Sequence, residues 1–572
     1  MDTMKTIAEP EKLRLGTSLP PGDPHGVSVH LPKWADTVGW ALREPRVVDA
    51  MTTGYPRFFL SLVVDRLAVR LLELASPSDV VGVEKTGQRL SRLLDSVRHA
   101  QMFRKALPEW DTTQRTSSRD IGVYTVTWDG EITAVKEDNV PNQFECRRIG
   151  DEGIVLVSYP AELAAEAKAF WQHTGFGISS RRATHWLEDA PFLSASPAPN
   201  PTPRPPAEMI SRKINHARAA LKQRIAIGHS SPSNNLHVSP SDVFLFPTGM
   251  TAITETADTI KSLRHPTPDS PYRVAIFGFP YVDTVKVLHR VLGYVPTLYH
   301  STPTALDTLE ETLLTGSIDM LITEFPGNPL LQSPDLTRLH ALAQKHHFVL
   351  VVDDTVGTHA SLALLGACDV VCTSLSKMFS GGCNVMGGTV TLNPASPFYH
   401  RLKDVLEGRR EKGEGEGAWF WEDVVTMEEN SRDFEARVAR ASANAEVVAG
   451  LLRGSGAVGE VYYPKGAPTQ ELYDRYRVEG GRYGFLVTVR FTAPERAVAF
   501  HDAMDVAKGP SFGTNFTLCC AHTLLAHYKE LEWAAEYGVV EHLVRISVGL
   551  EEREWLEERV TRALRAAEGV SV

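Results

Sequence analysis

Lys377 lies in the segment of the chain whose residue types offer the most chemistry. It follows an apolar run, residues 369–373, which has the pattern of a buried parallel strand. Two hydroxyl side chains, Ser374 and Ser376, stand between that run and the lysine, and small residues come after it. A lone lysine is usually a solvated surface residue. An amine held beside hydroxyls at the end of a buried strand instead suits covalent catalysis or proton transfer.

An acid ends a second apolar run. Residues 348–352 lead directly into Asp353. Because ligands of open α/β sheets bind at the carboxyl ends of the strands, we expect Asp353 and Lys377 to lie in one site. These groups match the needs of pyridoxal 5'-phosphate (PLP): the lysine can form a Schiff base, the acid can pair with the pyridinium nitrogen, and the serines can bind the phosphate. The sequence therefore predicts PLP as the cofactor.

The composition is that of an ordinary globular protein, and the length of 572 residues predicts two or more substructures. Hydrophobic residues make up 43% and charged residues 23%, and the net charge is −11 without a basic block, which argues against nucleic acid or an anionic membrane as a partner. No apolar run is long enough for a membrane span and no apolar signal core is present, so we expect a cytoplasmic protein. The six cysteines form no CxxC pair, and we expect reduced thiols and no metal site.

The chain divides into four parts. Residues 1–60 are rich in proline and glycine and predict an extended arm, and the proline-rich stretch 191–206 predicts a surface linker. The predicted division is an arm at 1–60, a helical segment and insertion with its linker at 61–239, a large cofactor-binding domain at 240–400 and a smaller C-terminal α/β domain at 401–572.

Apolar strands alternate with helical stretches between residues 243 and 391, which predicts an α/β fold with a mostly parallel sheet. The strands predicted there are 243–246, 274–277, 320–323, 348–352 and 369–373. Elsewhere we predict helices over 61–106, 160–171 and 210–225, two strands within 123–135, and strands at 154–157, 483–491 and 544–548. The charged stretch 407–417 is predicted to be a solvated loop.

Three further motifs follow predicted strands. The helix that begins near Gly249 and Met250 leaves free backbone amides that can bind a phosphate. Tyr281 can stack on a flat cofactor ring, and Asn328 can donate to the phenolic oxygen of that ring. Each motif alone has a simpler explanation in helix capping, packing or a turn. Five such motifs after five successive strands favour a single cofactor site.

The ordered motifs resemble those of the Cys/Met-metabolism family of PLP-dependent enzymes, which have the type I, aspartate-aminotransferase-like fold. Among them the chain is most similar to the extended fungal cystathionine γ-synthases. The segments that carry the resemblance are residues 248–250, 279–284, 324–329, 352–355, 374–388, 508–517 and 545–551. The resemblance covers about residues 15–60 and 240–560.

The resemblance implies a role for each matching residue. Lys377 is the implied Schiff-base lysine and proton shuttle, Asp353 the pyridinium partner and Tyr281 the stacking aromatic. Arg545 is implied to hold the substrate α-carboxylate, which a guanidinium fork suits, with Ser511 beside it. The implied phosphate cradle consists of Ser374, Ser376 and the amides of Gly249 and Met250.

Tyr55 and Arg57 resemble a pair that family members lend to the cofactor phosphate of the neighbouring subunit. The resemblance therefore implies a homodimer or homotetramer with shared active sites, in which Tyr55 also assists the lysine in proton transfer.

For the activity, the resemblance implies γ-replacement through a vinylglycine-type intermediate. Our first hypothesis is that an O-acyl-L-homoserine reacts with L-cysteine to give cystathionine, a transsulfuration step of methionine biosynthesis. The second keeps the intermediate but adds another nucleophile, a carbon acid or an amine, in specialised metabolism. A γ-lyase is a third possibility, and a cofactor-free scaffold that binds partners through residues 80–235 is a fourth.

Three features depart from the compact family pattern. Residues 80–235 resemble the insertion of fungal members. We predict a structural role for the basic turn 175–182 within them, with a position at the active site as the alternative. Cys383 stands where the resemblance leads us to expect a more polar residue. His522 is predicted to be packed or at the surface, with an acceptor pocket as the alternative. These residues bear on the acceptor and leave the predicted cofactor machinery intact.

Overall fold

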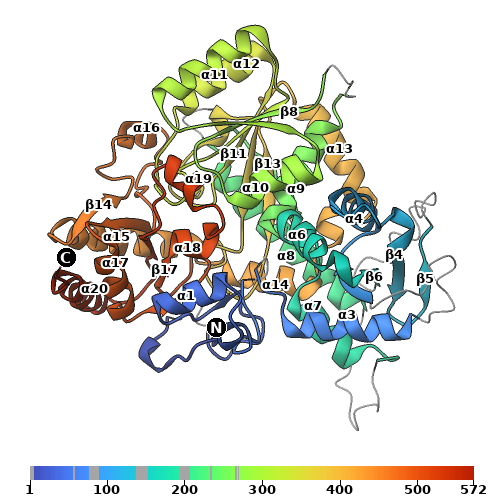
Figure 1. Ribbon diagram of the computed structural model, residues 1–572. Helices are drawn as coiled ribbons and strands as arrows, with labels where there is room; N and C mark the ends of the chain where they lie inside the picture. Colours follow the sequence, from blue (N-terminus) through green and yellow to red (C-terminus); the bar gives the residue numbers. More distant parts are fainter. Residues whose placement is uncertain are drawn as a thin grey trace.

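The computed structural model describes residues 6–55, 58–75, 89–136, 153–193, 207–231, 235–264, 267 and 270–571. Arg57, Cys146 and residues 194–206 of the predicted linker lie outside the described residues. The described chain forms a large central domain, a C-terminal domain, a domain inserted before residue 207 and an N-terminal arm (Figure 1). None of the described helices is long and apolar enough to cross a membrane.

The large domain is built on a seven-stranded sheet with the strand order β7-β13-β12-β11-β10-β8-β9. Its strands are β7 (Val243–Phe246), β8 (Arg273–Phe277), β9 (Val295–Tyr299), β10 (Met320–Glu324), β11 (Val349–Asp353), β12 (Val370–Ser374) and β13 (Gly388–Leu392). All neighbouring strands are parallel except β13, which runs antiparallel to β12 and β7. The apolar side chains of the central strands are buried on both faces, as expected when helices cover a parallel sheet.

The helices and turns of this domain are α8 (Ala207–His229), η5 (Pro240–Asp242), α9 (Gly249–Lys261), α10 (Val282–Lys286), η6 (Val287–Val291), α11 (Pro303–Thr315), α12 (Leu336–His346), η7 (Leu365–Ala367) and α13 (Tyr399–Glu411). Each of the five predicted strands is present and agrees with the structure to within one residue at either end. Strands β9 and β13 were not predicted. β9 is an exposed edge strand, and β13 alternates glycine and threonine with apolar residues, so neither forms an apolar run.

The C-terminal domain has a five-stranded sheet with the order β14-β15-β18-β17-β16. Its elements are η8 (Gly415–Gly417), α14 (Trp421–Asn430), α15 (Phe434–Arg453), β14 (Val458–Tyr462), α16 (Gln470–Asp474), β15 (Leu486–Phe491), α17 (Pro494–Ala503), β16 (Ala507–Lys508), β17 (Leu518–Ala521), α18 (His522–His527), α19 (Leu531–Glu536), β18 (Leu543–Ser547) and α20 (Arg553–Glu568). The two predicted C-terminal strands correspond to β15 and β18.

The inserted domain has a four-stranded antiparallel sheet with the order β3-β6-β4-β5. Its elements are α3 (Leu62–Leu74), β3 (Arg89–Leu94), α4 (Val97–Trp110), η2 (Ser118–Asp120), β4 (Gly122–Thr127), β5 (Ile132–Ala134), β6 (Gly153–Pro160), η3 (Ala161–Leu163), α6 (Ala164–Thr174) and α7 (Ser180–Asp189). The predicted strands β4, β5 and β6 are present. The prediction of helix throughout 61–106 was wrong at β3, whose mixture of arginine, serine and leucine gives no clear period.

The N-terminal arm consists of η1 (Pro10–Lys12), β1 (Ser18–Leu19), β2 (Ser28–Val29), α1 (Trp34–Ala41) and α2 (Pro45–Val48). In Figure 1 it lies between the C-terminal domain and the inserted domain. Val29, Trp40 and Val47 pack with Cys520 of β17, so the arm is held against the C-terminal domain by apolar burial.

The prediction of a solvated loop at 407–417 was wrong, because part of this stretch belongs to helix α13 and several of its charges are paired with other parts of the chain. Glu414 accepts from Arg98 of the inserted domain at 2.7 Å, and Arg409 contacts Glu255 at 2.7 Å. Buried Glu416 pairs with Lys222 of α8. The segment joins three parts of the chain by ion pairs, which a count of charges along the sequence does not reveal.

Candidate active site

Lys377 is buried, with 5% of its surface exposed, and its amine is held between two hydroxyls. Its Nζ donates to the Tyr55 hydroxyl at 3.0 Å and to the Ser511 Oγ at 3.1 Å. The amine also lies 4.4 Å from the centre of the Tyr55 ring and 4.7 Å from that of Phe512. A buried amine between a phenol and an alcohol has short paths for proton transfer in two directions.

Tyr55 belongs to the N-terminal arm of the same chain as this lysine. The prediction that the arm serves a neighbouring active site stays a prediction. The apolar packing of the arm on β17 brings Tyr55 to its own Lys377. Arg57, the predicted companion of Tyr55, lies outside the described residues.

Ser511 and Arg545 face the lysine from the C-terminal domain. Ser511 has φ of 89°, a left-handed conformation that costs a non-glycine residue roughly 1–3 kcal/mol and often marks a functional position. Arg545, on β18, donates to the Ser511 carbonyl oxygen at 2.9 Å and to Asn328 Oδ1 at 3.0 Å. The guanidinium is buried and lines one cavity with Lys377 and Tyr281. The predicted carboxylate-binding residue and the predicted lysine are thus brought together.

A carboxylate pair lies at the floor of the neighbouring cavity, which has a volume of about 570 Å³. Asp353 ends β11 and Glu324 ends β10, and the two residues are paired in register on these parallel strands. Burial and the charge of Asp353 raise the pKa of Glu324 to about 8. A positively charged group in this cavity would relieve the repulsion. Glu324 was not predicted as a site residue, although it ends its strand just as Asp353 does.

The predicted phosphate cradle is assembled at the start of α9. Thr248 caps this helix by accepting from the Thr251 amide at 3.0 Å. A Cβ atom on Gly249 would lie 2.6 Å from the Ser374 Cβ, so only glycine lets β12 end this close to the helix. Met250 is buried beside Gly249, and both line the cavity of Asp353 with Ser374. The free amides and dipole of the helix start favour an anion here.

Ser376 lies beside the cradle rather than at its centre. Its hydroxyl donates to the Gly387 carbonyl at 3.3 Å and accepts from the Gly387 amide at 3.0 Å. It lines an adjoining cavity together with Gly249 and Ser374. A phosphate bond from Ser376 would therefore replace its bond to the Gly387 carbonyl.

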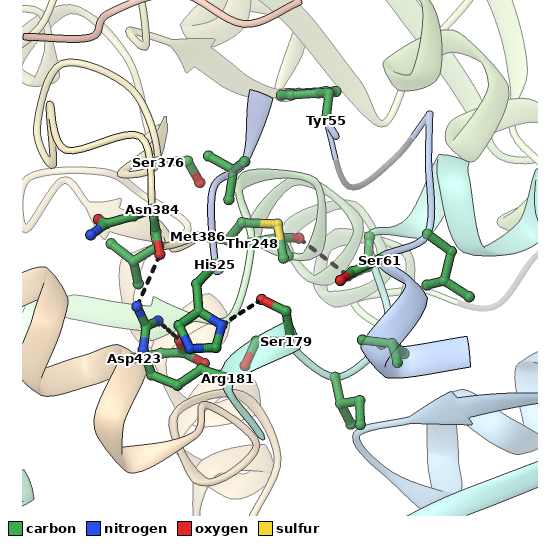
Figure 2. Close-up of a pocket in the computed structure, with 18 of the residues that line it drawn as sticks. His25, Tyr55, Ser61, Ser179, Arg181, Thr248, Ser376, Asn384, Met386 and Asp423 are labelled. Atoms are coloured by element: carbon green, nitrogen blue, oxygen red, sulfur yellow. Dashed lines mark hydrogen bonds and ion pairs between the residues drawn. The ribbon is translucent and has the colours of Figure 1, made fainter. Parts of the chain in front are cut away.

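The inserted domain closes one side of the site. Residues Gly175, Gly177 and Arg181 line the adjoining cavity together with Tyr55 and the phosphate cradle. Arg181 donates to the Asn384 carbonyl at 3.1 Å and pairs with Asp423, and Figure 2 shows this group at one wall of the cavity. A structural role was predicted for the turn 175–182, with a position at the site as the alternative, and its residues form part of the cavity wall.

Tyr281 is fixed by two neighbours. Its backbone amide donates to Glu324 at 2.5 Å, and its hydroxyl donates to Asp283 at 2.8 Å. Asp283 is fully buried and contacts His173 Nδ1 of the inserted domain at 2.8 Å. The ring of Tyr281 lines the cavity that holds Asp353 and Lys377, as its predicted stacking role requires.

The two unusual residues of the sequence have different surroundings. Cys383 is buried in a cluster with Leu19 and Val27, and burial raises the pKa of its thiol to about 12. His522 lines the cavity of Lys377 and Arg545. Burial, followed by the charges of Arg545 and His527, keeps the pKa of His522 well below its usual value. His522 is buried, in agreement with the first prediction of a packed residue, and it also lines this cavity, as the alternative of an acceptor pocket requires.

Comparisons with known proteins identify the family to which the chain belongs. A sequence model described as "Cys/Met metabolism PLP-dependent enzyme" matches residues 207–565. A second, described as "Fungal trans-sulfuration enzyme, N-terminal domain", matches residues 64–179, which contain most of the inserted domain. The chain belongs to the Cys/Met metabolism PLP-dependent enzymes. It is therefore an enzyme with PLP as its cofactor, and the scaffold hypothesis is excluded.

Relatives of this PLP-dependent enzyme match over nearly the whole chain. "Cystathionine gamma-synthase" of Neurospora crassa is 34% identical over 97% of this chain and 98% of its own length. "Cystathionine gamma-synthase-like enzyme iboG2" of Amanita muscaria is 35% identical over 99% and 98%. A solved structure of cystathionine γ-synthase from Xanthomonas oryzae pv. oryzae has a TM-score of 0.52 at 23% identity, covering 63% of this chain and 87% of that one, and supports the predicted type I fold.

The described residues fit PLP. The acidic pair Asp353 and Glu324 offers a partner for a protonated ring nitrogen, and the start of α9 offers an anion site for the phosphate. Lys377 lines the same cavity and supplies an amine. The roles of the individual residues follow from this fit and stay predictions.

Proposed function

We propose that this PLP-dependent enzyme catalyses γ-replacement on an O-acyl-L-homoserine with L-cysteine to give cystathionine. The observation that carries the proposal is the position of the Lys377 amine, 3.0 Å from the Tyr55 hydroxyl, in a cavity that also contains Arg545. The full-length similarity to the N. crassa protein named cystathionine γ-synthase supports the substrate pair.

In this proposal the cofactor withdraws electrons from the α-carbon, and the chain moves the protons. Lys377 would take the α-proton and, once the β-carbon has become acidic, a β-proton as well, because a flexible amine can reach both positions. Tyr55 and Ser511 receive and return the proton of the amine over distances of 3.0 and 3.1 Å. Asp353 keeps the ring nitrogen protonated, which maintains the electron withdrawal.

Substrate orientation is assigned to Arg545. Its two bonds to Ser511 and Asn328 hold the guanidinium in place and leave further N–H groups for a carboxylate. With the α-carboxylate held there, the α-carbon lies on the side of the cavity where Lys377 is found. The γ-substituent of the substrate then extends toward the cavity wall that includes Phe58 and His522.

The test is product analysis with defined donors. The purified holoenzyme is incubated with O-acetyl- or O-succinyl-L-homoserine, with and without L-cysteine, and the products are separated by mass spectrometry. Cystathionine formed only with cysteine supports the proposal. Formation of 2-oxobutanoate at the same rate with and without cysteine would instead identify a γ-lyase.

His522 favours a second candidate, γ-replacement with a nucleophile other than cysteine. Neither of its ring nitrogens has a hydrogen-bond partner among the described residues, and its lowered pKa leaves the imidazole neutral near pH 7. A neutral imidazole that lines the substrate cavity can accept a proton from an incoming carbon acid or amine. A panel of such acceptors, in place of cysteine, tests this candidate: a new adduct without cystathionine would select it.

The predicted homo-oligomer stays a proposal whose support is the family resemblance. Light scattering coupled to gel filtration distinguishes a monomer from a dimer or tetramer.

A further inference from the structure

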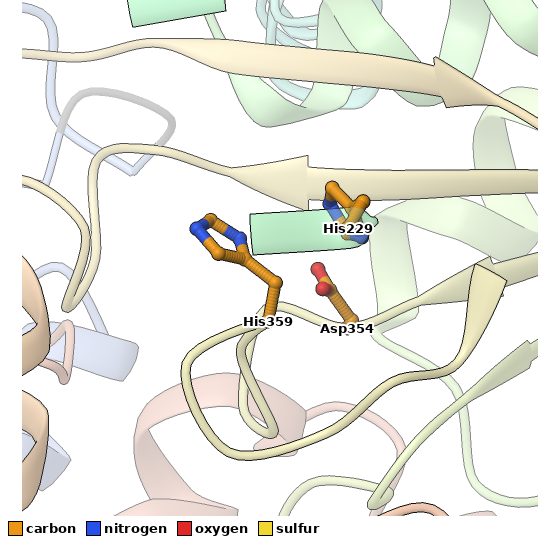
Figure 3. A group of neighbouring side chains, drawn as sticks. All are labelled: His229, Asp354 and His359. Atoms are coloured by element: carbon orange, nitrogen blue, oxygen red, sulfur yellow. The ribbon is translucent and has the colours of Figure 1, made fainter. Parts of the chain in front are cut away.

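A second cluster of side chains that can bind a ligand lies next to the strand end that carries Asp353. His229 ends helix α8, Asp354 directly follows β11, and His359 lies five residues further along the same loop. One ligand atom of each residue lies within 4.8 Å of those of the other two, and all three side chains are buried. Figure 3 shows the Asp354 carboxylate directed at the His229 ring, with the His359 ring on its other side.

The polar atoms of this cluster are not satisfied by hydrogen bonds. Both ring nitrogens of His229 and Nδ1 of His359 lack a partner within the described parts of the chain, although the two residues are only 3% and 5% exposed. A buried polar group left without a partner costs roughly 1–3 kcal/mol. Three such nitrogens beside one carboxylate therefore indicate a ligand.

The surrounding chain is arranged to bring these side chains together. Gly228 precedes His229, and a Cβ atom on it would overlap the His359 ring, so only glycine leaves room for that ring. Thr358 precedes His359 and has φ of +61°, a conformation that β-branched residues rarely adopt. Thr373 donates to Asp354 Oδ1 at 2.5 Å and fixes the carboxylate from β12. Such a partner to a ligating group is typical of metal sites.

We propose that His229, Asp354 and His359 bind a divalent transition metal ion, with Zn²⁺ as the preferred occupant. Two imidazoles and one carboxylate are a donor set that zinc proteins use with a water molecule in the fourth position, and the same arrangement is proposed for this ion. Bonds of about 2.1 Å in a tetrahedral site place ligand atoms about 3.4 Å apart, so the three side chains close around the ion by small torsions.

The ion would have a structural role, because it would connect two parts of the chain. It would join the end of α8, the helix that follows the inserted domain, to the loop that follows Asp353. Because Asp353 and Asp354 are adjacent, the ion would also fix the strand end that carries the predicted pyridinium partner. The proposal does not depend on which acceptor the enzyme uses.

The test is the metal content of tag-free holoenzyme purified from zinc-supplemented cells, measured by inductively coupled plasma mass spectrometry. We expect about one Zn²⁺ per chain and a fall in the thermal midpoint by several degrees on removal with a chelator. Zinc added back alone should restore the midpoint. Zinc X-ray absorption should report nitrogen and oxygen neighbours at about 2.0–2.2 Å.

The variant His359→Phe removes one ligand and retains an aromatic ring, which the neighbouring Phe379 and Phe434 can pack against. Its zinc content should fall at least tenfold. The matched control is His501→Phe, a fully buried histidine of the C-terminal domain that contacts Asp502, and it should keep its zinc. Zinc-free wild-type protein whose thermal midpoint does not respond to added Zn²⁺, or equal zinc in His359→Phe and wild type, would overturn the proposal, and neither result requires the variant to be active.

Discussion

The Tyr281 hydroxyl lies 2.8 Å from Asp283, and this pair connects the cofactor cavity to the inserted domain. Asp283 is fully buried and also contacts His173 and Gln172 of α6, at 2.8 and 3.3 Å. The inserted domain thereby holds the residue predicted to stack on the cofactor.

This connection predicts a loss of cofactor affinity in Asp283→Ala. Without the carboxylate, Tyr281 keeps its ring but loses the hydrogen bond that orients it, which should weaken PLP binding by about 1–2 kcal/mol, or roughly tenfold. Titration of the apoenzyme with PLP, followed by visible absorption, measures the change. In a Tyr281→Phe background the same substitution should add little, because the hydroxyl is already gone; full additivity would show that Asp283 acts elsewhere.

Arg545 should determine amino-acid affinity. Its guanidinium is buried and held by Asn328 and Ser511, so Arg545→Ala should cost about 2–5 kcal/mol in kcat/KM, mostly through KM. Arg545→Lys should recover only part of the loss, since an ammonium cannot form the paired bonds of the fork. Steady-state kinetics with an O-acylhomoserine checks this expectation. PLP binding serves as the control and should not change.

The cofactor half of the site was predictable because its signals are local. Lys377, Asp353 and Gly249 each follow an apolar strand, and parallel strands end at one edge of a sheet, so sequence order alone places them together. The contributions of Arg181 and His173 were not predictable in this way, and Tyr55 was identified through the family resemblance alone. They reach the site through packing between the arm, the inserted domain and the large domain, and no period in the sequence encodes those contacts.

Glu324 shows a signal that was available and not used. It ends an apolar strand, as Asp353 does. A second acidic side chain at that edge of the sheet predicts that the two carboxyl groups share one negative charge. The charged stretch 407–417 shows the opposite case. Its charges suggested a solvated loop, but their partners Arg98 and Lys222 lie far away in the sequence.

Lys377→Ala should abolish turnover, with a loss of at least about 10³-fold, while PLP still binds to the cradle. Tyr55→Phe should retain the ring contact with the amine and lose the proton path, which predicts a smaller loss of about 10- to 100-fold in kcat. Full activity of Lys377→Ala would refute the role of this lysine.

Mixing these two variants tests where the arm acts. Because Tyr55 lies on Lys377 of its own chain, co-expressed Tyr55→Phe and Lys377→Ala chains should show no more activity than the average of the two variants alone. Mixed oligomers purified by two different tags provide the sample. A gain of activity in them would show that the arm reaches the neighbouring subunit.

The docking of the inserted domain should weaken as the pH rises, because of His99. This side chain is 1% exposed, contacts Asp95 and Glu255 at 2.5 and 2.9 Å, and also lies 3.3 Å from Arg98. Burial alone would lower its pKa and Arg98 lowers it further, but the charge and hydrogen bond of Asp95, with the hydrogen bond of Glu255, outweigh both and raise the pKa to about 9. The folded protein therefore holds this proton more tightly than the unfolded chain does, whose histidines have a pKa of about 6.5.

The direction of the change in stability with pH follows from the linkage between proton binding and folding. A pKa raised on folding contributes stability that is fully present below pH of about 6.5 and is lost as the pH rises through about 9. Thermal midpoints of wild-type enzyme should fall across this range, and His99→Gln should be less stable at pH 6 with a flatter profile up to pH of about 9. His400→Gln, at an exposed position on α13, is the matched control and should follow wild type. If the thermal midpoint of wild type varied with pH as little as that of His99→Gln, His99 would be neutral in the folded protein. The ion pairs between the two domains would then not include His99.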